Sequence, residues 1–222
     1  MSETFKSQIK DLVDDLKAVF THVGLGGEAA EYKLLTQSFL YKFLNDKFLH
    51  QAKAIDASNS YEKLIDMSEE DYSWLLKFIG TSTAWLKPDQ LIETLHRQQN
   101  EATFYETFEN TLNQIAIDNN DIFSVHTDGD TAIRLFDERL ITDNISDGSK
   151  RNEVAKAIIN LLARVKFDET IFSQGFDFFS TLFEYMIKDY NKDGGGKYAE
   201  YYTPHSVAKI IADILVGNNQ PS

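Results

Sequence analysis

The sequence predicts a mainly α fold, and three features of the chain support that prediction. Apolar residues recur at three- and four-residue steps along most of the 222 residues, which is the spacing that places them on one face of a helix. Capping residues and glycines stand where these stretches begin and end. Hydrophobic residues make up 42% of the chain, enough to fill a core, so a disordered chain is excluded.

Two long helices are expected at the N-terminal end. The first runs from Phe5 to Val23, and three glycines within residues 24–27 end it. The second runs from about Glu28 to Ala54. Its inner side carries large apolar residues, namely Tyr32, Leu35, Phe39, Leu40, Phe43, Leu44 and Phe48. An aromatic stripe at this spacing is more typical of a core than of a ligand site.

Shorter helices are expected after Asn59-Ser60. Ser68-Glu-Glu-Asp71 is a capping signal with acidic residues in the first turn, and Gly80 ends the helix that follows it. Pro88 begins another helix, which we expect to continue through His96. A further helix is predicted from Thr103 to Ile117, because its apolar residues fall on one side.

Residues 119–148 have a different pattern. Asp-Gly pairs separate two short β-leaning runs, Ile122 to Val125 and Thr131 to Phe136, so we expect a long connector that can hold one small β-hairpin. A helix from Asn152 to Val165 follows. We place a domain boundary near residues 166–170, which divides the chain into a helical domain, 1–166, and the start of a second domain, 167–222.

Composition excludes several classes of protein. The chain has no cysteine, which excludes disulfides, thiolate metal sites and thiol nucleophiles and fits a reducing compartment. Its N-terminus lacks an apolar targeting segment, and no uncharged run approaches the ~20 residues needed to span a bilayer. We therefore expect a soluble, cytoplasmic protein.

The net charge of −13 has the wrong sign for a protein whose main task is to bind phosphates. The imbalance is local: 13 basic residues face 26 acidic ones before Lys150, and nine face nine from there on. One interpretation is an ordinary solvated acidic surface. The other is a surface for basic protein partners, or one that keeps DNA away from one side.

The most informative stretch is Gly194 to His205, which leads into an apolar-periodic segment from Ser206 to Val216. Its three glycines allow another molecule to approach the backbone closely. Thr203 can cap a helix whose first turn contains Pro204. Because the start of a helix attracts carboxylates and phosphates, the stretch predicts one half of a small-ligand site.

Glu200-Tyr-Tyr-Thr-Pro204, with glycines before it and a Val-Ala-x-Ile-Ile helix after it, resembles a segment of the adenine-N6 DNA methyltransferases. The likeness is closest to the modification subunits of type I restriction-modification systems. Ala29-Ala-Glu-Tyr-Lys33 and Phe39-Leu-Tyr-Lys-Phe-Leu-Asn-Asp46 look like the N-terminal helical domain of the same subunits. The resemblance implies S-adenosylmethionine as cofactor, with its methionine part lined by Tyr201, Tyr202, Thr203 and Pro204. Ala199 stands where many members carry a second glycine.

The resemblance also implies an activity and partners for the full-length protein. Such a subunit methylates adenine N6 in DNA together with a specificity subunit, a restriction subunit and a second modification subunit. The family's Asn/Asp-Pro-Pro-Tyr/Phe segment, which holds the flipped adenine, is absent here, because prolines occur only at positions 88, 204 and 221. We therefore expect the helical domain plus the start of a truncated α/β methyltransferase domain. It would have no catalytic residue, be inactive alone and serve contact with DNA or other subunits.

Two alternatives stay open. Asp189-x-Asn191-x-Asp193-Gly194, closed by Glu200, satisfies the literal pattern of a calcium-binding loop. Lys197 occupies a ligand position, however, and Pro204 interrupts the exiting helix, which favours a polar turn. The histidines, His22, His50, His96, His126 and His205, are scattered, so we expect no metal site. The second alternative is a stand-alone helical adaptor for protein interaction.

Overall fold

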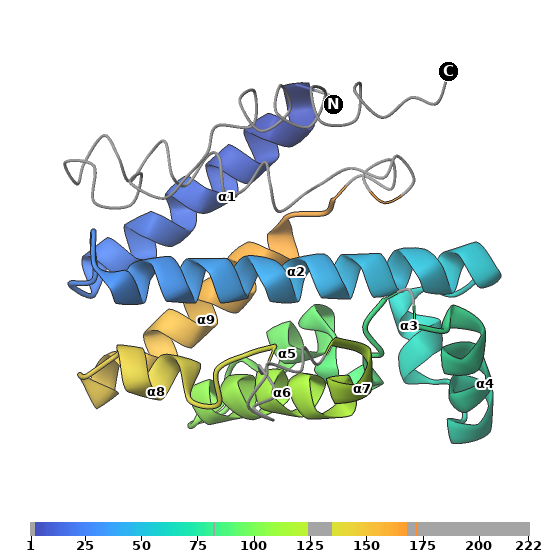
Figure 1. Ribbon diagram of the computed structural model, residues 1–222. Helices are drawn as coiled ribbons and strands as arrows, with labels where there is room; N and C mark the ends of the chain where they lie inside the picture. The colour runs from blue at the N-terminus through green and yellow to red at the C-terminus, as the bar shows by residue number, and fades with distance from the viewer. Residues whose placement is uncertain (1–2, 82, 124–134, 168–171, 173–222) are drawn as a thin grey trace, which may run out of the picture. The chain divides into compact units, whose positions relative to one another are not determined.

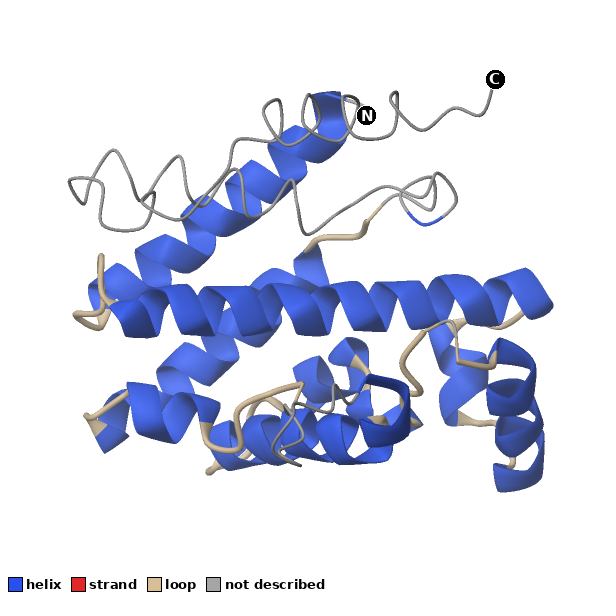
Figure 2. Cartoon of the chain, viewed as in Figure 1, coloured by secondary structure: helices blue, strands red, loops and turns tan. Residues whose placement is uncertain are grey.

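The computed structural model describes residues 3–81, 83–123, 135–167 and 172. The chain divides into two compact units, 1–176 and 177–222, and all described residues belong to the first. These residues form helices and connecting loops without a strand, which confirms the mainly α prediction (Figures 1 and 2). The domain boundary near residues 166–170 stays a prediction.

The helices follow one another with short connections. They are α1 (Glu3–His22), α2 (Ala29–Ile55), α3 (Tyr61–Ile65), α4 (Glu69–Ile79), the 3-10 helix η1 (Pro88–Gln90), α5 (Ile92–Gln98), α6 (Phe104–Asp118), α7 (Asn120–Phe123), α8 (Leu140–Asn144) and α9 (Gly148–Arg164). None of these helices combines the length and apolar character needed to cross a bilayer.

Helices α2 and α9 hold the unit together. Figure 1 shows α2 running across the molecule, with α1 on one side of it and α5 and α6 on the other. Helix α9 packs against α1, α5, α6 and α8. The core side chains of α1, α2, α6 and α9 are buried, as the helical spacing predicts. They include Leu16, Phe20, Leu35, Phe39, Phe108, Leu112, Ile158 and Leu162.

The turn between α1 and α2 uses glycine where the sequence analysis expects it. Gly24 has φ +89°, and the backbone N–H of Leu25 donates to the carbonyl of Phe20 at 2.9 Å. This pattern caps the C-terminus of a helix and requires a positive φ. Gly27, also with positive φ, donates to the Glu31 carboxylate at 2.7 Å at the start of α2. The first two predicted helices are therefore confirmed.

The helix expected from Pro88 through His96 is interrupted at Leu91, and that part of the prediction is wrong. Leu91 is extended, with φ −75° and ψ 142°, so η1 and α5 are separate. Two side chains of α2 bond the backbone groups at the break. The Tyr41 hydroxyl donates to the Gln90 carbonyl at 2.7 Å, and the Asn45 side-chain oxygen accepts from the Ile92 N–H at 3.0 Å. Tertiary hydrogen bonds therefore replace helical ones.

The connector also contains more helix than the sequence predicts. Ile122 and Phe123 lie in α7 instead of a strand, whereas residues 124–134 lie outside the described residues, so the hairpin remains a prediction. Helix α8 was not expected. Its Thr142 donates to the Glu109 carboxylate through both the backbone N–H, at 2.5 Å, and the hydroxyl, at 2.8 Å. Helix α9 begins at Gly148, four positions before the expected Asn152, because the Asp147 side chain caps it.

Candidate functional site

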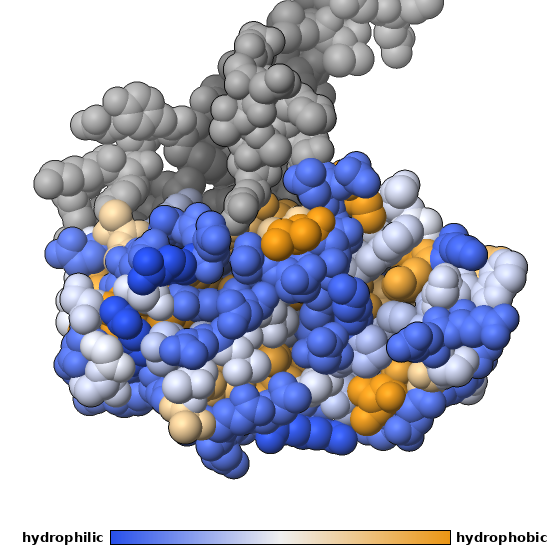
Figure 3. All heavy atoms as spheres, turned by 90° about the horizontal axis from the view of Figure 1, so that it is seen from below, coloured by the Kyte–Doolittle hydropathy of each residue, from blue (hydrophilic) through white to orange (hydrophobic). Residues whose placement is uncertain are grey.

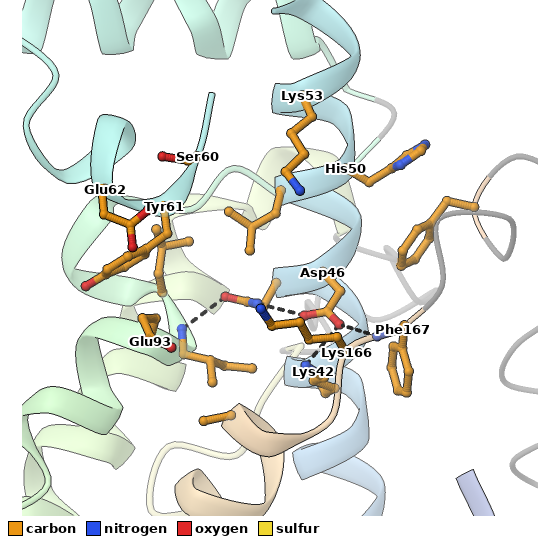
Figure 4. Close-up of a pocket in the computed structure, with 16 residues that line it drawn as sticks. Lys42, Asp46, His50, Lys53, Ser60, Tyr61, Glu62, Glu93, Lys166 and Phe167 are labelled. Carbon is orange, nitrogen blue, oxygen red and sulfur yellow. Dashed lines mark hydrogen bonds and ion pairs between the residues drawn. The ribbon is translucent and has the colours of Figure 1, made fainter. Parts of the chain in front are cut away.

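The predicted cofactor residues, Tyr201, Tyr202, Thr203 and Pro204, lie outside the described residues. So do the calcium-type loop from Asp189 to Glu200 and His205. Their arrangement in space is therefore still a prediction. The described residues offer a different polar feature, a pocket between α2, the starts of α3 and α5, and the end of α9 (Figure 4).

The pocket encloses about 370 Å³. One face of α2 supplies its longest wall, since residues three and four positions apart on a helix share a face. Figure 4 shows Lys42 and Asp46 next to each other on that wall, near Lys166 and Phe167. The lining residues are Lys42, Asn45, Asp46, Leu49, His50, Lys53, Ser60, Tyr61, Glu62, Leu91, Ile92, Glu93, Ala163, Lys166, Phe167 and Phe172.

A buried ion pair lies at the base of this pocket. The Nζ of Lys42 is 2.9 Å from Oδ2 of Asp46, and the two side chains are only 4% and 13% exposed. Burial lowers the pKa of Lys42, the neighbouring Asp46 carboxylate opposes that shift, and the nearby Lys166 adds to it. A charge removed from water this far is tolerated only when a partner compensates it. Lys42 therefore depends on Asp46.

The Asp46 carboxylate has further donors. Its Oδ2 accepts from the Phe167 backbone N–H at 3.2 Å, and its Oδ1 accepts from the Asn45 side-chain amide at 2.9 Å. The Lys42 ammonium lies 5.4 Å from the centre of the Phe167 ring, within the range of a cation–π contact. With three donors, Asp46 is committed to structure, and it is a poor candidate for a general base.

The rim of the pocket mixes both signs of charge. Two basic residues, Lys53 and Lys166, and two acidic ones, Glu62 and Glu93, line the pocket. The pocket therefore does not select strongly for an anion or a cation. The Tyr61 hydroxyl is 3.0 Å from the Thr94 hydroxyl, and the Arg97 guanidinium lies over the Tyr61 ring at 4.7 Å. The described residues contain no group of three or more His, Asp or Glu that could hold a metal ion. The specific contact of this pocket is structural, since Asp46 on α2 accepts from the backbone N–H of Phe167, just after α9.

Sequence reasoning did not identify this pocket. It singled out the stretch from Phe39 to Asp46 for its likeness to a family, and treated its aromatic residues as core. The available signal was the pair Lys42 and Asp46, four positions apart, with the apolar residues Phe43 and Leu44 between them. Such a pair usually lies on the surface. This pair is buried instead, and one residue that contacts both of its members is Phe167, 121 residues away from Asp46.

Comparison with known proteins gives two matches. Residues 174–222, which include all four predicted cofactor residues, match the family model described as N-6 DNA Methylase. The chain is also 24% identical over 223 residues to the "Type I restriction enzyme MpnII methylase subunit" of Mycoplasma pneumoniae (strain ATCC 29342 / M129 / Subtype 1). That alignment covers 96% of this chain and 39% of the relative. No solved structure matches the chain.

These matches confirm the resemblance found in the sequence. The likeness to a DNA methyltransferase subunit of the type I restriction-modification kind extends along nearly the whole chain. It therefore includes the helical unit as well as the stretch that contains Tyr201 to Pro204. The chain spans 39% of the length of the curated relative.

Proposed function

We propose that this chain, similar in sequence to type I methylase subunits, is the N-terminal part of a modification subunit that methylates adenine N6 in DNA. The observation that carries the proposal is the alignment with a type I methylase subunit over 96% of the chain. A chance Tyr-Tyr-Thr-Pro segment would not bring the helical unit, which lies within residues 1–176, into alignment as well. The match of residues 174–222 to N-6 DNA methylases supports the same reaction class.

S-adenosylmethionine is the proposed cofactor, and it would supply the methyl group when bound. In this chain, Tyr201, Tyr202, Thr203 and Pro204 would line the pocket for its methionine part. Support comes from their position inside the segment that matches the methylase family and from their residue types. A threonine before a proline can begin a helix, and the free N–H groups of a helix start favour a carboxylate such as that of methionine.

The described helical unit would provide contact instead of catalysis. Its buried carboxylate Asp46 is held by three donors, and the chain contains no Pro-Pro pair to hold a flipped adenine. The acidic excess before Lys150 favours basic surfaces of partner subunits over DNA as its main contact. The proposed partners are DNA, a specificity subunit, a restriction subunit and a second modification subunit, in the cytoplasm.

The test uses the complete open reading frame that contains this chain, co-expressed with its specificity subunit. Tritiated S-adenosylmethionine should label adenine N6 in duplex DNA. Tyr201→Ala combined with Tyr202→Ala should weaken cofactor binding, measured by equilibrium dialysis, by about tenfold or more, because each ring contributes buried contact area.

Tyr105→Phe is the matched control, because it removes a phenol hydroxyl from the helical unit and should leave cofactor affinity unchanged. The 222 residues alone should transfer no methyl group. Labelling of cytosine in place of adenine, or equal cofactor affinity in the Tyr201/Tyr202 variant and the parent, would contradict the proposal.

A further inference from the structure

Two aromatic side chains project from the outer face of α4. Trp74 is 53% exposed and Phe78 is 71% exposed, and the centres of their rings are 6.4 Å apart. Ile55, at the end of α2, is 43% exposed. Ile117, on α6, is the remaining large hydrophobic side chain classed as exposed in the described part of the chain. Exposed apolar residues that gather in this way, in place of single scattered ones, commonly mark an interaction site.

The fold of the helical unit does not need these rings. Helix α4 packs through its opposite face, where Tyr72, Leu75 and Ile79 are buried. The Tyr72 hydroxyl donates to the Leu86 carbonyl at 2.6 Å, and its ring lies 6.5 Å from that of Phe48 on α2. Trp74 and Phe78 instead lie on the face of α4 that the core leaves uncovered.

The exposed residues border a groove of about 740 Å³ between the end of α2 and α4. The groove, called here the α4 groove, has apolar walls and a polar rim. Its lining residues are Ile55, Asp56, Asn59, Lys63, Asp66, Met67, Ser68, Asp71, Trp74, Leu75 and Phe78. Figure 3 shows one face of the molecule, where apolar patches interrupt a largely hydrophilic surface.

The charge around the α4 groove is acidic. Residues 56–80 contain six acidic side chains and two basic ones. Lys63 is 2.9 Å from the Asp56 carboxylate, and Lys77 lies 4.7 Å from the centre of the Trp74 ring, so both cations already have partners. The carboxylates of Asp66 and Asp71 line the groove. Such a rim repels DNA phosphates and anionic lipid headgroups and attracts Lys and Arg.

We infer that the α4 groove docks a short segment of another protein in which bulky apolar side chains stand beside Lys or Arg. The apolar side chains would cover Trp74 and Phe78, and the basic ones would face the acidic rim. Aromatic residues in such positions often dominate binding energy. The inference goes beyond the proposed function, because its test requires neither S-adenosylmethionine nor methyl transfer.

The test selects binders from a phage-displayed library of random 16-residue peptides. The purified chain is the bait, and its Trp74→Ala/Phe78→Ala variant is used for counter-selection. Enriched peptides should combine bulky apolar residues with Lys or Arg. A labelled enriched peptide is then titrated with each protein by fluorescence anisotropy. Phe78→Ala should weaken binding by about tenfold or more, and Asp66→Lys should also weaken it.

Ile117→Ser and Asp143→Lys are the matched controls, since they change an exposed apolar and an exposed acidic residue on α6 and α8. Both should leave peptide affinity unchanged. The altered side chains are all exposed, so circular dichroism should show intact helices in every variant.

Three outcomes would overturn the inference: enrichment of neutral or acidic peptides, equal affinity for the Phe78→Ala variant, or displacement of the peptide by a 20-base-pair duplex or by phosphatidylserine vesicles. A peptide whose affinity falls equally in the control variants would count against it as well.

Discussion

The carboxylate of Asp46 accepts a hydrogen bond from the backbone N–H of Phe167, 121 residues further along the chain. The same oxygen receives the buried ammonium of Lys42 at 2.9 Å. One carboxylate therefore joins the middle of α2 to the residues that follow α9. Phe167 is among the last described residues, so this contact ties the end of the described chain, just after α9, to the side of α2.

Replacing Asp46 with Ala should destabilise the helical unit strongly. The substitution leaves the Lys42 ammonium buried without a compensating charge and the Phe167 N–H without its acceptor. Removal of one partner from a buried pair costs about 3–5 kcal/mol. Urea denaturation followed by circular dichroism should show this loss in the free energy of unfolding.

Asp143→Ala provides the control. Asp143 also pairs with a residue four positions away, Arg139, but both side chains of that pair are 63% exposed. Its effect should be within about 0.5 kcal/mol. Replacing both buried partners, as Lys42→Met with Asp46→Leu, should recover part of the loss. A loss of equal size at Asp46 and Asp143 would show that burial does not strengthen the pair.

The sequence predicts those helices whose signals are local. Helices α1, α2 and α4 have apolar periodicity together with glycine or serine at an end, and α6 has the periodicity alone. All four appear within about two residues of the expected bounds. The break at Leu91 could not be predicted in this way. It depends on Tyr41, which is 49 residues from its partner Gln90, and no local pattern records such a contact.

The same distinction applies to the candidate sites. The stretch from Tyr201 to Pro204 was identified because its residue types, in that order, resemble a family segment, and a resemblance does not require coordinates. The pocket around Lys42 was missed because a pair four positions apart looks the same whether exposed or buried. The exposure of Trp74 could not be predicted for a related reason, since apolar residues on both faces of a short helix do not reveal which face the core covers.

Two buried tyrosines should make the helical unit sensitive to alkaline pH. Burial raises the pKa of Tyr41, and the nearby Asp89 adds to the shift; the same two causes raise the pKa of Tyr72. Above about pH 10, the unfolded chain loses these protons while the folded chain keeps them. The stabilisation is therefore complete below that pH and is lost as the pH rises toward the folded pKa values.

Lys42 changes the stability with the opposite sign, because its pKa is lowered on folding. Its contribution to the free energy of unfolding rises with pH and becomes constant above about pH 10.5. The free energy of unfolding, measured with urea at several pH values above that point, should fall. Tyr41→Phe should cost about 1 kcal/mol at neutral pH, from the lost bond to Gln90, and should make the alkaline fall shallower. An identical alkaline slope in this variant would exclude Tyr41 as a cause.

Any residue with a side chain at position 80 should lower the free energy of unfolding. The φ of +64° and ψ of −150° at Gly80 fall in a region that is essentially restricted to glycine. An added Cβ would meet nothing within 4 Å, so the cost of Gly80→Ala comes from the backbone alone and should be about 1–3 kcal/mol. Gly148→Ala is the comparison, because Gly148 is helical and its Cβ would also meet nothing. The urea midpoint should fall for the first variant and stay level or rise for the second.

Asn119 should be the residue on which the loop between α4 and η1 most depends. Its side-chain oxygen accepts from the Trp85 N–H at 2.6 Å, and its amide donates to the Trp85 carbonyl at 2.8 Å. Asn119→Ala leaves both backbone groups without partners, at a cost of about 2–4 kcal/mol. Asn144→Ala removes a bond only to the carbonyl of Leu140, within its own helix, and should cost less than about 1 kcal/mol.

Tryptophan fluorescence measures the same loop. In a Trp74→Phe background, Trp85 is the sole tryptophan of the chain, so its emission should shift to longer wavelength in the Asn119 variant alone. Unchanged emission together with unchanged stability would show that the loop is held by other contacts.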